Sequence, residues 1–317
     1  MTRMLARTAL LVSGSLALSI AVKVTVVLLI GFGATSVLGR SRASLRHAVL
    51  TSVFGVLLLF PATSVIIPPL DIRLARPAID DAGPDVLTAD RKTGWVTAVS
   101  PVPLAAVGQP RAFVLSMEQT LLAAWVLGAA VFLVPLTTGF WKLRLIRRCG
   151  APWHDGAQLL AALAAEARIR RPVEACLHED VIAPMTCGAG HPLVLLPTTI
   201  HEWAQHEVEQ ALVHELEHVR RWDWLVRIST RAVCAMYWWH PMVWVAARRL
   251  NVEAERACDD AVLADAEPTT YAEQLVGLAK RMAIGTRPAL GMISRSDLSA
   301  RVTAVLDAGQ ARGRSAH

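Results

Sequence analysis

The stretch Val213-His214-Glu215-Leu216-Glu217-His218-Val219 places an H-E-x-x-H motif in a run without Pro or Gly that extends over residues 202–219. Such a run predicts a helix, and on a helix His214 and His218 share one face because they are four residues apart. Two imidazoles on one face are suited to hold one Zn²⁺, and Glu215 beside them is placed to take a proton from a zinc-bound water. The alternative is a charged, solvated helix face, on which Glu and His are common.

A catalytic zinc site needs a third protein ligand and an open position for water. The later run Asn251–Asp260 predicts a helix rich in carboxylates, and spacing alone does not choose between Glu253 and Glu255 as the ligand. Asp259 lies four residues after Glu255 on the same face, where it is placed to fix the tautomer of a ligand histidine. The competing explanation is that these carboxylates only solvate the helix. We interpret Cys258 as a small buried residue, with zinc ligation as the alternative.

Four segments, in this order, resemble motifs of a known family: Gly188–Pro197, Val213–Asp223, Trp238–Trp244 and Glu255–Asp259. They resemble the P-x-V-L-L-P, H-E-x-x-H-x-x-R-x-D, aromatic-aromatic-Asn/His-Pro and E-x-A-C-D segments of the BlaR/MecR membrane metallopeptidases. The resemblance covers about residues 115–310. The prenyl-protease and HtpX-type membrane gluzincins share the more general H-E-x-x-H and E-x-x-A/C-D pattern.

The resemblance implies that His214, His218 and Glu255 bind zinc and that Glu215 is the general base. It favours Glu255 over Glu253 as the third ligand. It also implies that Asp259 accepts a hydrogen bond from a ligand histidine and does not itself bind zinc. The fold that it implies is that of a gluzincin. The substrate implied is a cytoplasmic transcriptional repressor of the BlaI/MecI type, or the protein itself.

The best-known members of that family add a fourth transmembrane helix and an extracellular penicillin-binding sensor domain. We find neither before His317, and no S-x-x-K motif of the β-lactam-binding type. We therefore do not expect this chain to sense β-lactams directly, and a separate sensor protein is a candidate partner.

The composition predicts a membrane protein, since 54% of the residues are hydrophobic and only 18% are charged. Three apolar runs of bilayer length, at about 9–30, 48–67 and 117–140, are predicted to be transmembrane helices of a multi-pass α-helical membrane domain, residues 1–140. A signal peptide is the alternative for the first run. Its apolar character persists through Leu38, however, which is longer than a usual signal sequence.

Basic residues flanking the runs predict their orientation in a cell membrane. They lie between the first two runs and directly after the third, at Arg40, Arg42, Arg46, Lys142, Arg144, Arg147 and Arg148. Both flanks should be cytoplasmic, which places the loop 68–116 outside and residues 141–317 inside. Arg3 and Arg7, which then lie outside, count against this orientation.

The charge and the cysteines agree with this topology. The net charge of +6 belongs mostly to the membrane part, and with no recognisable motif it does not predict nucleic-acid binding. All five cysteines follow the third run, which predicts reduced thiols in the cytoplasm.

Residues 141–317 are predicted to form one cytoplasmic α+β, zincin-like metalloprotease domain. Gln158–Arg168 predicts a helix, whereas Val173–Leu177 and Leu193–Leu196 predict strands, with 183–190 pairing between them. We expect the 193–196 strand to be an edge strand that holds an extended substrate beside the metal. The alternative is a buried structural strand.

The apolar, aromatic segment Ala232–Ala247 is short for a membrane span and is bracketed by Arg231, Arg248 and Arg249. We expect it to lie against the membrane interface, because three tryptophans suit that position. A fourth span is the alternative, but it would put Glu255 across the membrane from His214. His240 before Pro241 predicts a turn or a helix start, not a metal ligand.

Some features stay open. Tyr237, Tyr271 and His206 are candidates for stabilising an oxyanion, and the sequence does not rank them. Residues 274–307 contain amphipathic helix signals. Within them, Lys280-Arg281 and Gly285–Pro288 are candidates for self-cleavage, although an exposed basic pair is the simpler explanation.

The leading hypothesis is zinc-dependent hydrolysis of a peptide bond. One alternative is a protease for quality control of membrane proteins. Another is a signal-relaying membrane protein with a structural metal site, although such a site needs no base at Glu215. Few ionisable residues lie within the spans, which argues against a carrier or channel.

Overall fold

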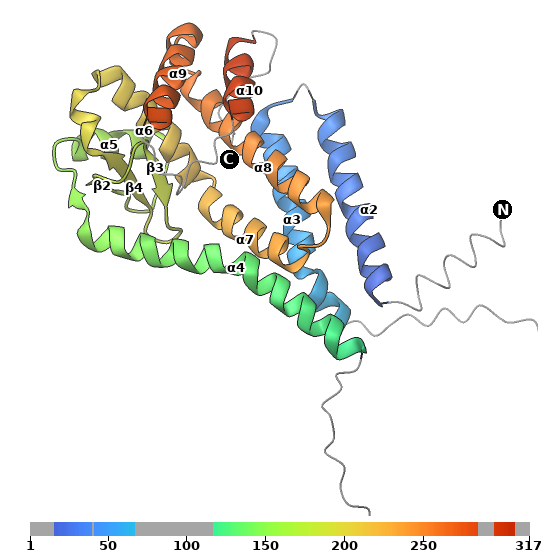
Figure 1. The fold of residues 1–317 in the computed structure, drawn as a ribbon. Helices are drawn as coiled ribbons and strands as arrows, with labels where there is room; N and C mark the ends of the chain where they lie inside the picture. Colours follow the sequence, from blue (N-terminus) through green and yellow to red (C-terminus); the bar gives the residue numbers. More distant parts are fainter. Residues whose placement is uncertain (1–15, 40, 67–116, 285–294, 308–317) are drawn as a thin grey trace, which may run out of the picture.

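The computed structural model describes residues 16–39, 41–66, 117–284 and 295–307 of the chain. It consists of three long apolar helices, a small sheet, and helices that connect and cover these parts (Figure 1). In Figure 1, α4 runs along the lower edge of the molecule, from the apolar helices to the sheet. The fold is therefore mostly helical, with one small sheet.

Among the described residues, three helices are long and apolar enough to cross a membrane. They are α2 (Leu16–Val37), α3 (Ala43–Ile66) and α4 (Met117–Cys149). Their apolar windows are Leu18–Val37, Ala43–Pro61 and Gln119–Arg148. The first window continues past residue 30 because residues 31–37 contain no Pro and no charge. The residues before 16 and the loop 68–116 lie outside the described residues.

The sheet contains four strands in the order β1-β2-β4-β3. They are β1 (Ala151–Pro152), β2 (Glu174–His178), β3 (Met185–Cys187) and β4 (Leu193–Pro197). β4 runs parallel to β2 and antiparallel to β3. Two predictions are therefore wrong: the 183–190 segment does not pair between the other two strands, and the 193–196 strand is not at the edge.

The reason for the second error is that β4 is apolar and buried at every position. Val194 and Leu196 pack towards α5 (Ala157–Glu166) and α6 (Gln205–Arg220). Leu193 and Leu195 pack on the other face, against side chains of α4 and against Trp224. A strand covered on both faces is a continuous apolar run, so β4 is a structural strand and β3 is the edge strand. The predicted helix over 158–168 is confirmed as α5.

The predicted interfacial segment 232–247 is divided between two helices that form a hairpin. α7 (Asp223–Met236) ends at Tyr237, and α8 (Pro241–Val262) begins after His240, which is its N-cap residue. The prediction that His240 marks a helix start is confirmed. The fourth-span alternative is wrong, because the chain turns back at residues 237–240 and returns Glu255 to the side of His214.

This hairpin shares a core with the apolar helices. Val24 and Leu28 of α2 and Phe54 and Leu57 of α3 form one buried cluster with Val233, Tyr237, Val243 and Leu250 of the hairpin. The aromatic ring of Phe132 in α4 lies 5.0 Å from that of Trp244. The apolar helices are thus packed against the α7–α8 hairpin, which carries Glu255.

Two last helices, α9 (Pro268–Ile284) and α10 (Arg295–Leu306), pack against one another and against α8 (Figure 1). They confirm the helix signals in residues 274–307. Lys280 and Arg281 are exposed on α9, as an ordinary basic pair would be, and Gly285–Pro288 lies outside the described residues. The cysteines whose side chains are described, Cys176, Cys187, Cys234 and Cys258, are free thiols, as predicted.

Candidate metal centre

The H-E-x-x-H motif lies on α6, as predicted. The helix has no internal Gly or Pro, and the Glu207 carboxylate accepts a hydrogen bond from the Ala204 N–H at the helix start, at 3.2 Å. The rings of His214 and His218 lie on one face, with centroids 5.2 Å apart. Both side chains are largely buried, with 11% of their area exposed.

Glu255 faces both histidines from α8. Its Oε2 lies 3.5 Å from His214 Nε2, and its Oε1 lies 3.6 Å from His218 Nε2. The side chain is 26% exposed, so this group of atoms is reachable from solvent. Two Nε2 atoms and one carboxylate therefore converge on one point.

Glu253, the other candidate, points elsewhere. Its carboxylate is buried and pairs with Arg46 of α3, with the Nε and Nη2 atoms each 2.8 Å from Oε2. Arg46 was expected only as a basic flank of the second span, yet it is buried in this ion pair. The structure thus separates the two glutamates, because residues two apart on a helix point in different directions.

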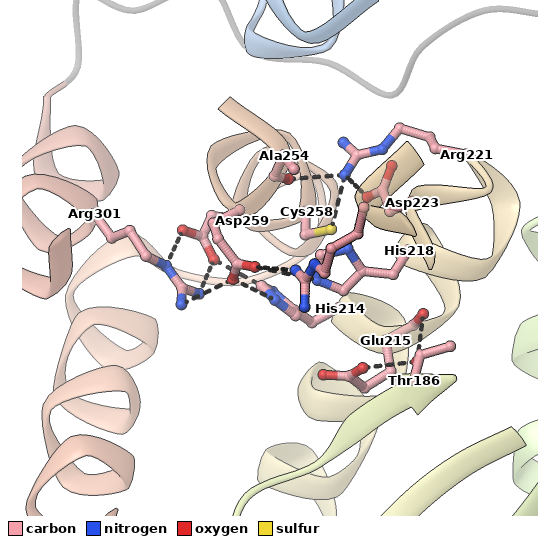
Figure 2. Close-up of polar contacts among 12 residues, drawn as sticks. Thr186, His214, Glu215, His218, Arg221, Asp223, Ala254, Cys258, Asp259 and Arg301 are labelled. Carbon is pink, nitrogen blue, oxygen red and sulfur yellow. Dashed lines mark hydrogen bonds and ion pairs between the residues drawn. The ribbon is translucent and has the colours of Figure 1, made fainter. Parts of the chain in front are cut away.

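Asp259 lies behind His214. Its Oδ1 is 3.3 Å from His214 Nδ1 and accepts a hydrogen bond from Tyr271 Oη at 2.9 Å. Arg301 of α10 donates to both oxygens of Asp259, at 2.7 and 2.9 Å (Figure 2). Its Nη1 also lies 3.2 Å from Glu255 Oε2.

The charges around His214 favour a cation at this place. Burial opposes a charged imidazole, but the hydrogen bonds with Asp259 and Glu255 outweigh it and raise the pKa of His214 to about 9. Burial would raise the pKa of Asp259, but the Arg301 charge and the His214 hydrogen bond hold it below its usual range. The pKa of Glu255 is likewise low despite burial, because His214 and Arg301 stabilise the carboxylate.

Asp223 plays the same part behind His218. It is the first residue of α7, and its Oδ2 lies 2.7 Å from His218 Nδ1. It reaches back to α6 because Trp222 adopts a left-handed conformation, with φ of 60°, and turns the chain sharply. The Arg171 guanidinium stacks on the Trp222 ring, 3.6 Å from its centroid.

Asp223 is itself held by two side chains from different elements. Arg221 Nη2 donates to Asp223 Oδ2 at 2.5 Å and to the Ala254 carbonyl at 2.8 Å (Figure 2). His47 Nε2 of α3 lies 3.6 Å from Asp223 Oδ1. Burial would raise the pKa of Asp223, but His218 and Arg221 hold it well below its usual range. One apolar helix thus contacts the support of a candidate ligand directly.

Glu215 points to the edge strand, not to the other carboxylates. Its Oε2 accepts a hydrogen bond from Thr186 Oγ1 of β3 at 2.7 Å (Figure 2). The same hydroxyl lies 3.2 Å from the Glu215 carbonyl oxygen. Thr186 therefore fixes the carboxylate beside the two histidines and next to the free edge of the sheet.

A second donor set is present, in which His214, His218 and Cys258 offer atoms that all lie within 4.8 Å of one another, among the described residues. We favour Glu255 over Cys258 for two reasons. The Cys258 thiol is completely buried, whereas the Glu255 carboxylate is 26% exposed, and a catalytic zinc site keeps a position open to water. Its sulfur also accepts a hydrogen bond from Arg221 Nη2 at 3.1 Å.

The residues present therefore fit a metal ion of the zinc type. In each histidine the Nδ1 atom faces a carboxylate, which leaves Nε2 free to bind a cation. Two imidazoles and one carboxylate form the ligand set of many catalytic zinc sites, with a fourth position for water. The alternative of a merely solvated face does not apply to these buried groups.

The three candidates for oxyanion stabilisation lie at different distances from the candidate metal site. Tyr237 Oη donates to the Leu57 carbonyl inside the helical core, and His206 is exposed near the start of α6. Tyr271 is close, but it lies behind His214, 3.3 Å from Nδ1. A residue that the sequence did not suggest is Arg227, which is half exposed and lies 3.5 Å from Glu255 Oε1.

Sequence reasoning also missed Thr186, Arg301 and His47. Nothing in their local sequence marks them, since each acts through a contact made across the fold. Asp223 stood in the quoted motif without a role. Its position five residues after His218 was the available signal, provided that a turn separates the two helices.

Comparisons with known proteins agree with this geometry. The BlaR1 peptidase M56 family matches residues 11–305, so the chain belongs to this family of metallopeptidases. The resemblance drawn from the four segments is thereby confirmed.

Two curated relatives are similar to part of the chain. The chain is 29% identical to the regulatory protein BlaR1 of Bacillus licheniformis over 162 residues, 48% of this chain and 27% of that protein. It is 21% identical to the methicillin resistance mecR1 protein of Staphylococcus aureus over 145 residues, 45% of this chain and 25% of that protein. The chain thus matches about a quarter of the length of either relative.

Proposed function

We propose that this protein is a membrane-bound zinc-dependent endopeptidase that acts in signal transduction. The observation that carries the proposal is the convergence of His214 Nε2 and His218 Nε2 on the Glu255 carboxylate, at 3.5 and 3.6 Å. The intact Glu215 beside them supports catalysis over a structural role, because a structural metal site needs no base.

Each residue then has a distinct part in hydrolysis. His214, His218 and Glu255 would hold Zn²⁺, and Asp259 and Asp223 orient the histidines. Zinc, when bound, supplies a Lewis acid and lowers the pKa of a water molecule. Glu215 accepts the proton of the attacking water and returns it to the amine that leaves. Thr186 keeps the Glu215 carboxylate pointed at that position.

The substrate would bind along β3. This strand pairs with β4 on one side, and its other edge has no partner strand in the described sheet. An extended peptide added to this edge would form main-chain hydrogen bonds next to Glu215, since Thr186 lies in the middle of β3. This assigns to β3 the role that the sequence suggested for the 193–196 strand.

We propose a BlaI/MecI-like repressor, or the protein itself, as substrate. The support is the resemblance of the four segments, and the similarity to a relative that is named a regulatory protein. The orientation proposed from the basic flanks places residues 141–317 in the cytoplasm, where such a repressor would be.

The proposal is tested on purified, detergent-solubilised protein by measuring zinc content and cleavage of a neighbouring-gene repressor. We expect about one zinc per chain in the wild type and in Glu215→Gln, with cleavage lost only in the variant. Glu255→Ala should lose both zinc and cleavage. The exposed Glu273→Gln on α9 is the matched control and should behave as wild type.

Three outcomes would change the conclusion. A folded wild type that binds no zinc would favour an inert signal-relay protein. Retention of zinc in Glu255→Ala would redirect the third ligand to Cys258, which Cys258→Ser would then test. Cleavage of misfolded membrane proteins but not of the repressor would favour a quality-control protease.

A further inference from the structure

The turn of the α7–α8 hairpin lies deep among the three apolar helices. Tyr237 Oη donates to the Leu57 carbonyl of α3 at 3.2 Å, and His240 Nε2 lies 3.0 Å from Thr25 Oγ1 of α2. Trp125 Nε1 of α4 donates to the Met236 carbonyl at 3.0 Å. One short turn thus touches all three helices that are able to span a membrane.

The contact points lie far from the helix ends that are proposed to be cytoplasmic. With a rise of about 1.5 Å per residue, Thr25 is about 18 Å from Val37 along α2, and Leu57 is about 17 Å from Arg46 along α3. Half of the hydrocarbon core of a bilayer is about 15 Å. A moderate tilt of the helices still leaves the turn near the middle of the membrane.

The outer surface of the hairpin is apolar. Leu225, Trp239 and Val245 are 47%, 40% and 59% exposed. The neighbouring window of α4 has none of its residues buried, and its Leu127 is 68% exposed. An apolar surface that continues from a candidate span onto the hairpin is costly in water but suited to lipid.

Three carbonyl groups of the turn are paired within the protein. The Met236 carbonyl accepts from Trp125, the Tyr237 carbonyl from the His240 N–H, and the Trp238 carbonyl from Trp244 Nε1 at 3.1 Å. Non-helical backbone at membrane depth is tolerated only when its polar groups are satisfied by protein or water. An ordinary surface turn leaves such groups to water, so this pairing suits a turn surrounded by lipid and helices.

Arginines set the depth to which the hairpin enters. Arg231 lies about 9 Å before Tyr237 along α7, and Arg248 lies about 10 Å after Pro241 along α8. No charged residue lies between these two arginines. Their long side chains are able to reach the membrane surface from a position slightly below it. The charge-free arms, about 9 and 10 Å long, therefore span one leaflet of about 15 Å only with the arginine side chains extended to the surface, and they are too short for two.

We propose that the α7–α8 hairpin is re-entrant: it inserts from the cytoplasmic side into one leaflet of the lipid bilayer and returns. The proposal rests on the proposed three-span topology. Its consequence concerns the substrate, because Glu255 lies about 21 Å from Pro241 along α8. Its neighbour Glu253 pairs with Arg46 near the cytoplasmic end of α3. The candidate active site is thereby held at the membrane surface, and the bond it cleaves has to come that close to the membrane.

The test measures depth by spin-label EPR on the full chain in liposomes. Single cysteines replace Trp239, Val245 and Leu225 in a background without Cys149 and Cys176; the remaining thiols, Cys187, Cys234 and Cys258, are buried. Leu127→Cys on α4 is the lipid reference, and the exposed Gln158→Cys on α5 is the water reference. Zinc content of each labelled variant reports whether it has folded.

We expect collisions with oxygen to dominate over collisions with a water-soluble nickel complex at positions 239 and 245. The depth should decrease in the order 239, 245, 225, because Val245 lies about 7 Å and Leu225 about 18 Å from the turn. Water-like values at positions 239 and 245, with Leu127 in lipid, would overturn the re-entrant hairpin and leave the spans intact. Water-like values at Leu127 as well would show instead that the proposed topology has failed.

Discussion

The two histidines of the candidate site are supported from opposite sides of the molecule, and the two supports differ in origin. His218 is held by Asp223, whose partners are Arg221 and, on the apolar helix α3, His47. His214 is held by Asp259, whose partners are Tyr271 and Arg301 on the last two helices. The first support is tied to the proposed membrane part of the chain, and the second to its C-terminal part.

The supports also differ in strength. Asp259 accepts three hydrogen bonds, two of them from the Arg301 guanidinium, in a fully buried setting. Asp223 shares Arg221 with the Ala254 carbonyl and Cys258, and its contact with His47 is 3.6 Å long. The C-terminal support is thus the better satisfied, and the membrane-side support is the more easily altered.

The largest effect should follow from removing each aspartate. Asp259→Ala leaves the buried Arg301 without its main partner, which costs about 3–5 kcal/mol of folding free energy, and it releases His214. We expect zinc affinity to fall by about 10–100-fold in Asp259→Ala and in Asp223→Ala, with the larger loss of stability in Asp259→Ala. Chelator competition and thermal unfolding measure the two quantities.

The exposed Asp155→Ala is the control for these variants. If Asp223→Ala lost more stability than Asp259→Ala, the order of the two supports would be the reverse of what the contacts indicate.

The comparison also shows how far sequence reasoning reached. Asp259 was predictable, because its place four residues after Glu255 on one helix is a local property. Arg301 was not, because its contact with Asp259 depends on how α10 docks against α8. The order of the strands was missed for the same reason: local patterning identifies β3 and β4 as strands but does not choose which of them lies at the edge.

The proposed membrane part shows a similar division between local and long-range features. Three apolar runs and their basic flanks were readable from composition, since bilayer length is a local requirement. The pairing of Arg46 with Glu253 and of His47 with Asp223 was not, because charged side chains near a helix end resemble topological signals until a partner is seen. The turn at residues 237–240 was read correctly as a helix start, but its position among the spans was not.

The next effect in size concerns the arginines. Arg301→Met should reduce the stability of the protein more than Arg221→Met does, because Arg301 contacts two carboxylates, Asp259 and Glu255. We expect the loss for Arg301→Met to approach about 3 kcal/mol, the lower end for breaking a buried ion pair. Denaturant unfolding of the zinc-free proteins in detergent measures this difference. The exposed Arg170→Met is the control. Equal losses of stability in Arg301→Met and Arg221→Met would mean that the two supports do not differ in strength.

A smaller effect is expected for Tyr271→Phe. The change removes one donor to Asp259, while Arg301 still satisfies the carboxylate, so the loss of stability should be about 1 kcal/mol. If Tyr271 only supports His214, zinc affinity should fall slightly and the catalytic rate of the zinc-loaded enzyme should stay nearly unchanged. A large fall in kcat with unchanged zinc affinity would instead place the hydroxyl at the reacting atoms.

The smallest effect, and the one that tests the membrane-side support most directly, is expected for His47→Ala. His47 acts on zinc only through Asp223 and His218, and its contact with Asp223 is the longest of the series. We expect zinc affinity to fall by less than about tenfold, the lower bound for residues that contact a ligand directly. The exposed Ser52→Ala on α3 serves as the control, since it changes the same helix away from the site. His47→Gln should recover part of the loss if the ring acts only as a neutral polar group beside Asp223 Oδ1. An unchanged zinc affinity in His47→Ala would mean that α3 packs beside the site without holding it, and that movement of this helix has no direct route to the metal.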